Sequence, residues 1–194
     1  AVVTEWLVYR TPDFDRIKLA WGFIPQFGCL ATLLTHMFLH DNWAHLLGNT
    51  IFFLVPGMKL EDAIGPRRFA LVYLTGGFAA NAAHAYLASD LPAPMIGASG
   101  AIAAIVGAFM TLYPTSRMIF WILPPLPLTI MLPAWFFLGF WFFRELGMGY
   151  FMRIAGVESP IAVWAHVGGF LYGAALMRFE HGWSAGRRLE ARRP

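Results

Sequence analysis

Ser99 and His166 are two residues whose side-chain types could together carry out hydrolysis. Serine is a weak nucleophile until a neighbouring base removes its proton, and histidine is the most frequent base in such pairs. Ser99 lies in the turn Gly97-Ala98-Ser99-Gly100, which opens an apolar segment, and His166 lies in a second apolar segment. Ionisable groups in membrane-type segments cost several kcal/mol and normally mark function. The pair therefore predicts hydrolysis within or beside a membrane.

The residues around this pair favour catalysis as well. Gly97 and Gly100 permit a tight turn and the close approach of a substrate carbonyl. The expected helix would begin at Ser99, where free backbone N–H groups and the positive end of the helix dipole favour developing negative charge. Small residues beside His166 (Ala165, Gly168 and Gly169) would let its helix pack tightly on the serine helix.

A histidine-rich segment supplies further polar groups. His45 and Asn49 are four residues apart, so both face one side of a helix and could donate hydrogen bonds to an oxyanion. The competing interpretation is that His36, His40 and His45 bind a metal or haem, and His36 and His40 also share a face, as metal-binding pairs do. No carboxylate or cysteine joins them at ligand spacing, so we expect no metal and interpret both as residues that steady a loop through hydrogen bonds.

Each of these signals has a simpler interpretation when it is taken alone. Gly-x-Ser-Gly in a glycine-rich membrane protein is more often a helix-packing feature. A single histidine in a span can be structural, can bind a cofactor or can belong to a proton path. The catalytic interpretation is favoured because the serine and the histidine are expected at the same depth in the membrane.

The composition indicates a polytopic helical membrane protein. The 194 residues are 58% hydrophobic and only 13% charged, whereas a soluble domain carries about a quarter charged residues. The single cysteine excludes an internal disulfide framework and any cysteine-rich metal site. A net charge of +3 does not argue for nucleic acid, because the basic residues are not gathered on a soluble face. We expect the lipid bilayer to be the main partner.

The hydropathy pattern divides one membrane domain, residues 1–194, into three parts. Residues 1–42 are interpreted as an outer loop with an entry helix, 43–179 as the transmembrane core and 180–194 as a basic cytoplasmic tail. The third span is about 15 residues, roughly 22 Å, which is short of the ~30 Å hydrocarbon core, so Ser99 should lie below the membrane surface in a buried aqueous pocket. The predicted spans are 43–60, 69–87, 99–113, 134–146 and 161–179, with a short interfacial helix within 10–28, a proline-rich interfacial or re-entrant connector at 118–133 and a loop at 147–160.

The distribution of basic residues predicts the orientation. Placing the loop after the first span and the C-terminal tail on the cytoplasmic side leaves Ser99 and His166 open to the outer face. A bacterial inner membrane is the expected location. The cytoplasmic side then holds Lys59, Arg67, Arg68, Arg117, Arg178, Arg187, Arg188, Arg192 and Arg193, against Arg10, Arg16, Lys18, Arg144 and Arg153 outside.

From about Thr32 to Phe179, the chain resembles the rhomboid intramembrane serine proteases. Glu61-x3-Gly65 and Pro133-Ala134-Trp135 also look like family features. Any one motif is weak, but all of them in the right order are highly specific. The three main motifs are His36-x3-His40-x4-His45-x3-Asn49, Gly97-Ala98-Ser99-Gly100 and Ala165-His166-x2-Gly169.

The resemblance implies a six-helix core with a Ser99–His166 dyad rather than a triad. It implies that His45, Asn49 and the Ser99 backbone amide form the oxyanion hole. The loop before Pro160 would be a flexible cap, and the span from residue 134 a candidate lateral gate. The implied substrates are transmembrane segments of other proteins, and no metal or cofactor is needed.

Three departures from the family pattern stand out. Only five spans are visible, so the first core helix is expected to be missing or reduced to Ala1–Tyr9. The Trp-Arg dipeptide of the first outer loop is absent. Ala103 replaces an aromatic residue that stacks on the base in some relatives, so His166 must be held by other packing.

Two other functions fit parts of the pattern. A catalytically silent rhomboid-like protein would bind membrane clients without cleaving them, but such proteins usually lose the serine or the histidine, and this chain keeps both. A transporter also places polar groups at mid-depth on broken helices. No internal repeat is evident, however, and the ionisable residues within the spans are almost all histidines.

Overall fold

A computed structural model of the chain describes residues 14–88, 93–121, 129–157 and 161–190. Two short helices come first, α2 (Phe14–Trp21) and α3 (Thr32–Thr35), followed by the 3-10 turn η1 (His36–Phe38). α2 is the short helix expected within residues 10–28. The possible remnant of a first core helix, Ala1–Tyr9, lies outside the described residues.

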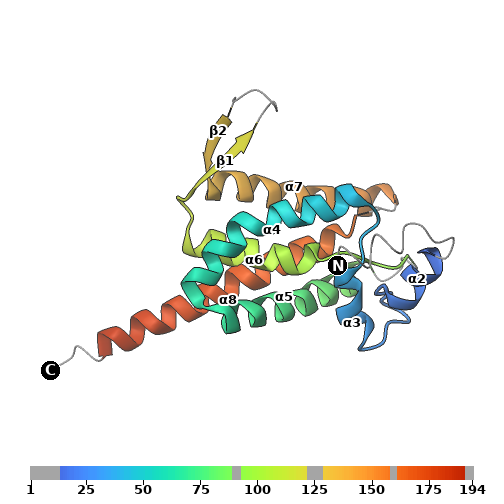
Figure 1. Cartoon of the computed structure of the whole chain (residues 1–194), viewed down its shortest axis with the longest axis horizontal. Helices are drawn as coiled ribbons and strands as arrows, with labels where there is room; N and C mark the ends of the chain where they lie inside the picture. The colour runs from blue at the N-terminus through green and yellow to red at the C-terminus, as the bar shows by residue number, and fades with distance from the viewer. Residues whose placement is uncertain (1–13, 89–92, 122–128, 158–160, 191–194) are drawn as a thin grey trace.

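Five long helices make up the body of the molecule and run largely side by side (Figure 1). All five expected spans begin within three residues of a helix start, and the spans that begin at 43, 99 and 134 begin at the helix start itself. The helices are α4 (Trp43–Ile64), α5 (Pro66–Leu87), α6 (Ser99–Leu112), α7 (Ala134–Ala155) and α8 (Val163–Glu190).

Local signals set several of the helix ends. The Asn42 side chain caps α4 by accepting a hydrogen bond from the His45 backbone N–H at 2.8 Å. Gly65, with φ of +81°, ends α4, and Pro66 then begins α5 at a position that needs no N–H donor. Gly156, with φ of +63°, ends α7 in the left-handed conformation typical of a helix C-terminus.

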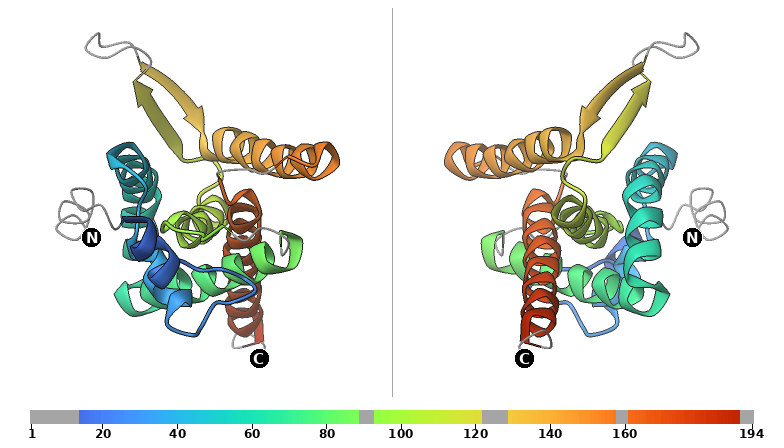
Figure 2. Two further views of the ribbon diagram at one scale, coloured as in Figure 1. Left: turned by 90° about the vertical axis from the view of Figure 1, so that its right-hand side faces the viewer. Right: turned by 90° about the vertical axis from the view of Figure 1, so that its left-hand side faces the viewer.

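α6 is the central helix of the bundle. Seen along the bundle, it is surrounded by α4, α5, α7 and α8 (Figure 2). All of its residues from Gly100 to Phe109 are buried. A helix that is apolar on every side belongs in the core, because it has no face for polar surroundings. The serine at its first position is therefore held by the most enclosed element of the fold.

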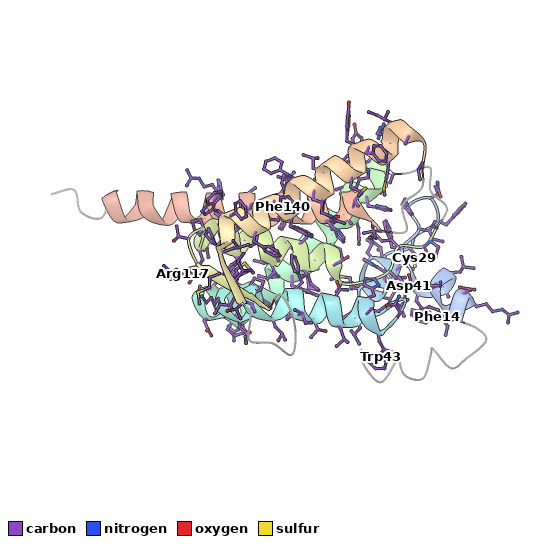
Figure 3. All side chains as sticks on the ribbon, turned by 90° about the horizontal axis from the view of Figure 1, so that it is seen from above. Phe14, Cys29, Asp41, Trp43, Arg117 and Phe140 are labelled. Atoms are coloured by element: carbon purple, nitrogen blue, oxygen red, sulfur yellow. The ribbon has the colours of Figure 1, made fainter. Side chains whose placement is uncertain are left out.

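α7 differs from the prediction in length and direction. The expected loop at 147–160 is wrong for its first half, because the helix continues through Gly147 and Gly149 to Ala155. α7 also crosses the bundle obliquely, which is clear beside α4 in Figure 3, where the exposed Phe140 is labelled on it. Residues 158–160, the end of the expected cap, lie outside the described residues.

The proline-rich connector is a β-hairpin, which the sequence analysis did not predict. β1 (Arg117–Trp121) pairs antiparallel with β2 (Thr129–Pro133), with Arg117 opposite Pro133 and Trp121 opposite Thr129. The hairpin projects from the bundle beside the start of α7 (Figure 1). The Ala134 N–H donates to the Ser116 carbonyl at 2.8 Å and so ties the start of α7 to the residue before β1.

The chain is mostly helical, in agreement with the expected class. α8 extends past the predicted end of the fifth span at residue 179, so part of the expected tail is helical up to Glu190. By length and apolarity taken together, none of the helices in the described part of the chain qualifies as a membrane-crossing segment.

Candidate active site

The structure brings Ser99 and His166 into hydrogen-bond contact. The Ser99 Oγ and the His166 Nε2 are 2.8 Å apart, although 67 residues separate them in the chain. Ser99 is the first residue of α6, and His166 lies in the first turn of α8. A nucleophile and a base within 2.6–3.2 Å is the arrangement that serine activation requires.

Small residues let the two helices approach closely enough for this contact. A Cβ atom on Gly169 would lie 2.1 Å from the Gly100 carbonyl oxygen, and one on Gly173 would lie 1.9 Å from the Ala104 carbonyl oxygen. The predicted tight packing on the serine helix is thus correct for Gly169. Gly168 serves another contact, since its Cβ would lie 2.2 Å from the Cβ of Ala83 on α5.

A carboxylate that the sequence analysis did not select completes the contacts of His166. The Glu145 Oε2 lies 2.9 Å from the His166 Nδ1, and the side chain of Arg144 contacts the Glu145 Oε1. Glu145 belongs to α7 and is 3% exposed. The resemblance implied a dyad without a third residue, whereas here a buried acid is bonded to the ring on the side opposite the serine.

α7 also supplies the packing that replaces the missing aromatic at Ala103. The Trp141 ring lies 5.8 Å from the His166 ring between centroids, at 36° between the planes. Trp141 in turn contacts Phe170, one turn further along α8, at 6.1 Å. The expectation that other packing must hold His166 is met by this tryptophan.

His45 and Asn49 lie beside the turn that precedes the serine. A Cβ atom on Gly97 would lie 2.8 Å from the His45 Nε2 and 3.6 Å from the Asn49 Nδ2, so both groups approach this backbone closely. Gly97 also has φ of +110°, a conformation that residues with side chains disfavour. Both the close approach of His45 and Asn49 and this backbone conformation therefore require glycine here. Gly100 is required instead by the α5 contact, because its Cβ would lie 2.6 Å from that of Ala80.

Each of these side chains carries a hydrogen-bond donor close to this turn. The His45 Nδ1 accepts the Asp41 backbone N–H at 3.4 Å, which leaves the ring proton on Nε2. The Asn49 Nδ2 is buried and has no hydrogen-bond partner among the described residues. These two donors have the chemistry of an oxyanion hole.

The four predicted residues open onto one cavity of about 620 Å³, whose lining includes Ser99, His166, His45 and Asn49. Lys18 and Asp41 lie at the same cavity and form an ion pair at 3.5 Å. Hydrogen bonding to Asp15 raises the pKa of Lys18, so its ammonium group is charged at neutral pH. The cavity therefore combines a polar end with enough volume for a short peptide segment.

Neither His36 nor His40 is among the residues that line the cavity. The predicted side-chain hydrogen bonds are not seen for the buried His36 ring, whose nitrogens have no partner among the described residues. The rings instead lie near other rings, His36 at 6.1 Å from Phe23 and His40 at 5.1 Å from His45 between centroids. The His36 backbone carbonyl accepts the Gly97 N–H at 2.9 Å and so ties the loop to the serine turn. Burial lowers the pKa of both imidazoles from 6.5 to about 4. Across the described residues, no three His, Cys, Asp or Glu side chains are grouped as metal ligands would be.

Comparison of the sequence with known proteins places the chain in a family. A family model described as the Rhomboid domain matches residues 28–182. The chain is 31% identical over 144 residues to the rhomboid protease GluP of Bacillus subtilis, an alignment that covers 74% of the chain and 25% of that protein. It is 36% identical over 77 residues to human rhomboid-related protein 3, which covers 40% of the chain and 19% of the relative.

A longer alignment reaches a plant relative. RHOMBOID-like protein 6, mitochondrial, of Arabidopsis thaliana is 28% identical over 171 residues, 85% of the chain and 50% of that protein. The chain thus spans half or less of the length of these three relatives. The domain match extends over most of the chain and includes all four predicted site residues and Glu145. The chain therefore belongs to the rhomboid family, whose members are integral membrane proteins.

Proposed function

We propose that this protein is an intramembrane serine endopeptidase that cleaves transmembrane segments of other membrane proteins. The observation that carries the proposal is the 2.8 Å contact between the Ser99 Oγ and the His166 Nε2, beside a cavity that His45 and Asn49 also line. Rhomboid membership and relatives named as rhomboid proteases support it.

The first chemical step is attack by the serine. The His166 Nε2 takes the Ser99 hydroxyl proton while the Oγ attacks the scissile carbonyl carbon, and the carbonyl oxygen becomes an oxyanion. The His45 Nε2–H, the Asn49 Nδ2–H and the Ser99 backbone N–H then donate to that oxygen. His166 returns the proton to the leaving amine, and an acyl-enzyme remains on Ser99.

The second step is hydrolysis. Water enters through the cavity that Lys18 and Asp41 border, loses a proton to His166 and attacks the acyl carbon. The bond from that carbon to the Ser99 Oγ then breaks, His166 returns the proton to the Oγ, and the product leaves with a new carboxyl end. A substrate helix must unwind locally to present its carbonyl in this cavity. Segments with small or helix-breaking residues near one end are therefore the favoured substrates, and the site opens to the outer face of the membrane.

The test is labelling of the detergent-solubilised protein by a fluorophosphonate probe, which reacts only with an activated serine. We expect labelling of the wild-type protein and none of Ser99→Ala or His166→Ala. Ser116→Ala, which removes a serine that bonds Lys59 far from the cavity, is the matched control and should label normally.

Thermal unfolding of each variant checks that it folds. Labelling that survives Ser99→Ala or His166→Ala would refute the mechanism. A folded wild-type protein that never labels would favour a rhomboid-like protein that binds membrane clients without cleaving them.

A further inference from the structure

We propose that Glu145 is a positioning residue for the His166 base, so that Ser99, His166 and Glu145 work as a hydrogen-bonded triad. The inference rests on the proposed function, because it assigns a role within that reaction. It differs from the dyad that the family resemblance implies. The carboxylate comes from α7, whereas the serine and the histidine come from α6 and α8.

The geometry is a continuous chain of hydrogen bonds. The Ser99 Oγ lies 2.8 Å from the His166 Nε2, and the Glu145 Oε2 lies 2.9 Å from the Nδ1 of the same ring. A carboxylate can only accept, so the proton of a neutral His166 ring must sit on Nδ1. The lone pair on Nε2 then faces the serine hydroxyl, which is the tautomer that a general base needs.

The burial of Glu145 is difficult to explain by an ion pair alone. A buried carboxylate is costly unless it is paired and hydrogen-bonded, and Glu145 is 3% exposed. Arg144 pairs with its Oε1, but the Arg144 side chain is 51% exposed, so a pair limited to these two residues could form at the surface with less desolvation. What burial adds is the contact between Oε2 and the histidine ring.

The neighbouring turn of α7 strengthens the assignment. Trp141 precedes Glu145 by four residues, so both side chains project from one face of the helix. The Trp141 ring lies beside the His166 ring, tilted by 36° to it, while Glu145 contacts its Nδ1. One helix thereby fixes both the tilt and the rotation of the imidazole.

One proton moves in the first chemical step, from Ser99 to His166. When the Ser99 Oγ attacks, its proton moves to Nε2, and the ring becomes an imidazolium that holds protons on both nitrogens. The positive charge then faces the Glu145 carboxylate. Arg144 stays bonded to the other oxygen and balances the charge before the substrate binds.

The experiment compares Glu145→Gln with the wild-type protein in fluorophosphonate labelling. The amide has the same shape but carries no charge, and its NH2 group can donate to Nδ1, which would place the ring proton on Nε2. We expect the labelling rate at saturating probe to fall, by up to about 10⁴-fold, the size of the loss for the equivalent change in Ser-His-Asp proteases. The probe concentration for half-maximal rate should stay unchanged.

The pH profile separates positioning from a structural role. In Glu145→Gln the acid limb of the profile should move to lower pH, because a protonated ring no longer faces an anion. Glu145→Asp keeps the charge but is one methylene too short for the 2.9 Å contact, and should be intermediate. Asp62→Asn, an exposed carboxylate on α4, is the matched control and should behave as the wild type.

A spectroscopic measurement covers the case in which Glu145→Gln does not fold. In ¹⁵N-histidine-labelled wild-type protein, the His166 ring should show a downfield Nδ1–H proton, assigned by its loss in His166→Gln. An Nε2–H tautomer would overturn the inference, as would a folded Glu145→Gln with the rate and pH profile of the wild type. If Glu145→Gln behaves as the wild type but labelling still depends on Ser99, the role of Glu145 is refuted and the proposed serine endopeptidase is not. A folded wild-type protein that does not label would refute both proposals.

Discussion

The amide of Asn49 is the residue-level feature that best fits the proposed oxyanion hole. Its Nδ2 is buried without a hydrogen-bond partner among the described residues. Leaving a buried donor unsatisfied costs about 1–3 kcal/mol. An oxyanion formed on the substrate carbonyl would recover this cost only as the transition state is reached, which is the condition for catalysis.

Asn49→Ala should therefore lower the maximal rate of probe labelling by roughly 10²–10³-fold, the usual loss for one oxyanion donor. Thermal stability should change little, since the Asn49 Nδ2 has no hydrogen bond to lose among the described residues. Thr50→Ala is the matched control, because its hydroxyl bonds only the Leu46 carbonyl of the same helix, and it should keep the full rate. Equal rates in both variants would exclude Asn49 from the oxyanion hole.

The four site residues could be found from the sequence because each has a local signature. Ser99 lies between glycines, His166 lies beside small residues, and His45 and Asn49 have the spacing of one helix face. Glu145 had no such signature, because 21 residues and a chain reversal separate it from His166. One signal was available in the sequence: Glu145 lies near the end of the apolar 134–146 span. A charged residue inside a predicted span is costly and therefore often has a function.

At the scale of elements, the contact between α6 and α8 determines whether the serine and the histidine meet. The two backbones touch at Gly169, whose missing Cβ leaves room for the Gly100 carbonyl, directly after Ser99. Gly169→Ala should therefore separate the helices, at a cost of about 1–3 kcal/mol for overpacking.

Thermal unfolding and labelling together check this prediction. We expect a lower melting temperature and slower labelling for Gly169→Ala. Gly139→Ala, on α7, adds the same methyl group where no atom lies within 4 Å, and should lower neither the melting temperature nor the labelling rate. A normal labelling rate for Gly169→Ala would mean that this contact does not align the pair.

The prediction of elements succeeded where local signals were strong and failed where tertiary packing decided. Gly147 and Gly149 are poor helix formers, by about 1 kcal/mol each relative to alanine, and so they predicted a loop. In the fold, Gly149 faces the Trp164 ring of α8, where a Cβ would lie 3.0 Å from two ring atoms. The glycine there is a packing residue of α7. The hairpin was missed because its prolines outweighed the short apolar strands on either side.

At the scale of the whole molecule, the site lies at the end of the bundle that carries α2 and α3, and α8 ends at the opposite end (Figure 1). Cys29 and Asp41 are both labelled near the site end in Figure 3. Cys29 is the single cysteine of the chain and is exposed. Hydrogen bonding from the Thr32 backbone lowers the pKa of its thiol, which favours the reactive thiolate.

A membrane-impermeant maleimide should therefore label Cys29 in intact spheroplasts of a bacterial expression host if the site opens outward. Arg67→Cys in a Cys29→Ser background places the only thiol at the connection between α4 and α5, and should label only after the cells are permeabilised. The reverse pattern would invert the proposed orientation.

The protein should also lose stability in mild acid through the loop before α4. His36 and His40 have pKa values of about 4 in the folded protein because both rings are buried, against 6.5 when exposed. The unfolded state therefore binds more protons between these values. The contribution of both rings is complete above pH 6.5 and is lost as the pH falls from 6.5 toward 4.

Thermal unfolding in detergent at a series of pH values measures this effect. The melting temperature should be level above pH 7 and fall steadily below 6.5. His36→Asn removes one of the two groups and should flatten the slope. A variant with the slope of the wild type would show that the acid sensitivity arises elsewhere.

The oblique helix α7 has a consequence for the order of events. It is the candidate lateral gate, and it carries both the ring and the acid that hold His166. If a client helix entered by pushing α7 outward, both supports would leave the base together. While α7 was displaced, His166 would be out of position to act as a base. Bond cleavage would then follow only after α7 had returned to its place with the client helix bound. This coupling would protect neighbouring membrane proteins from cleavage when they contact α7 only briefly.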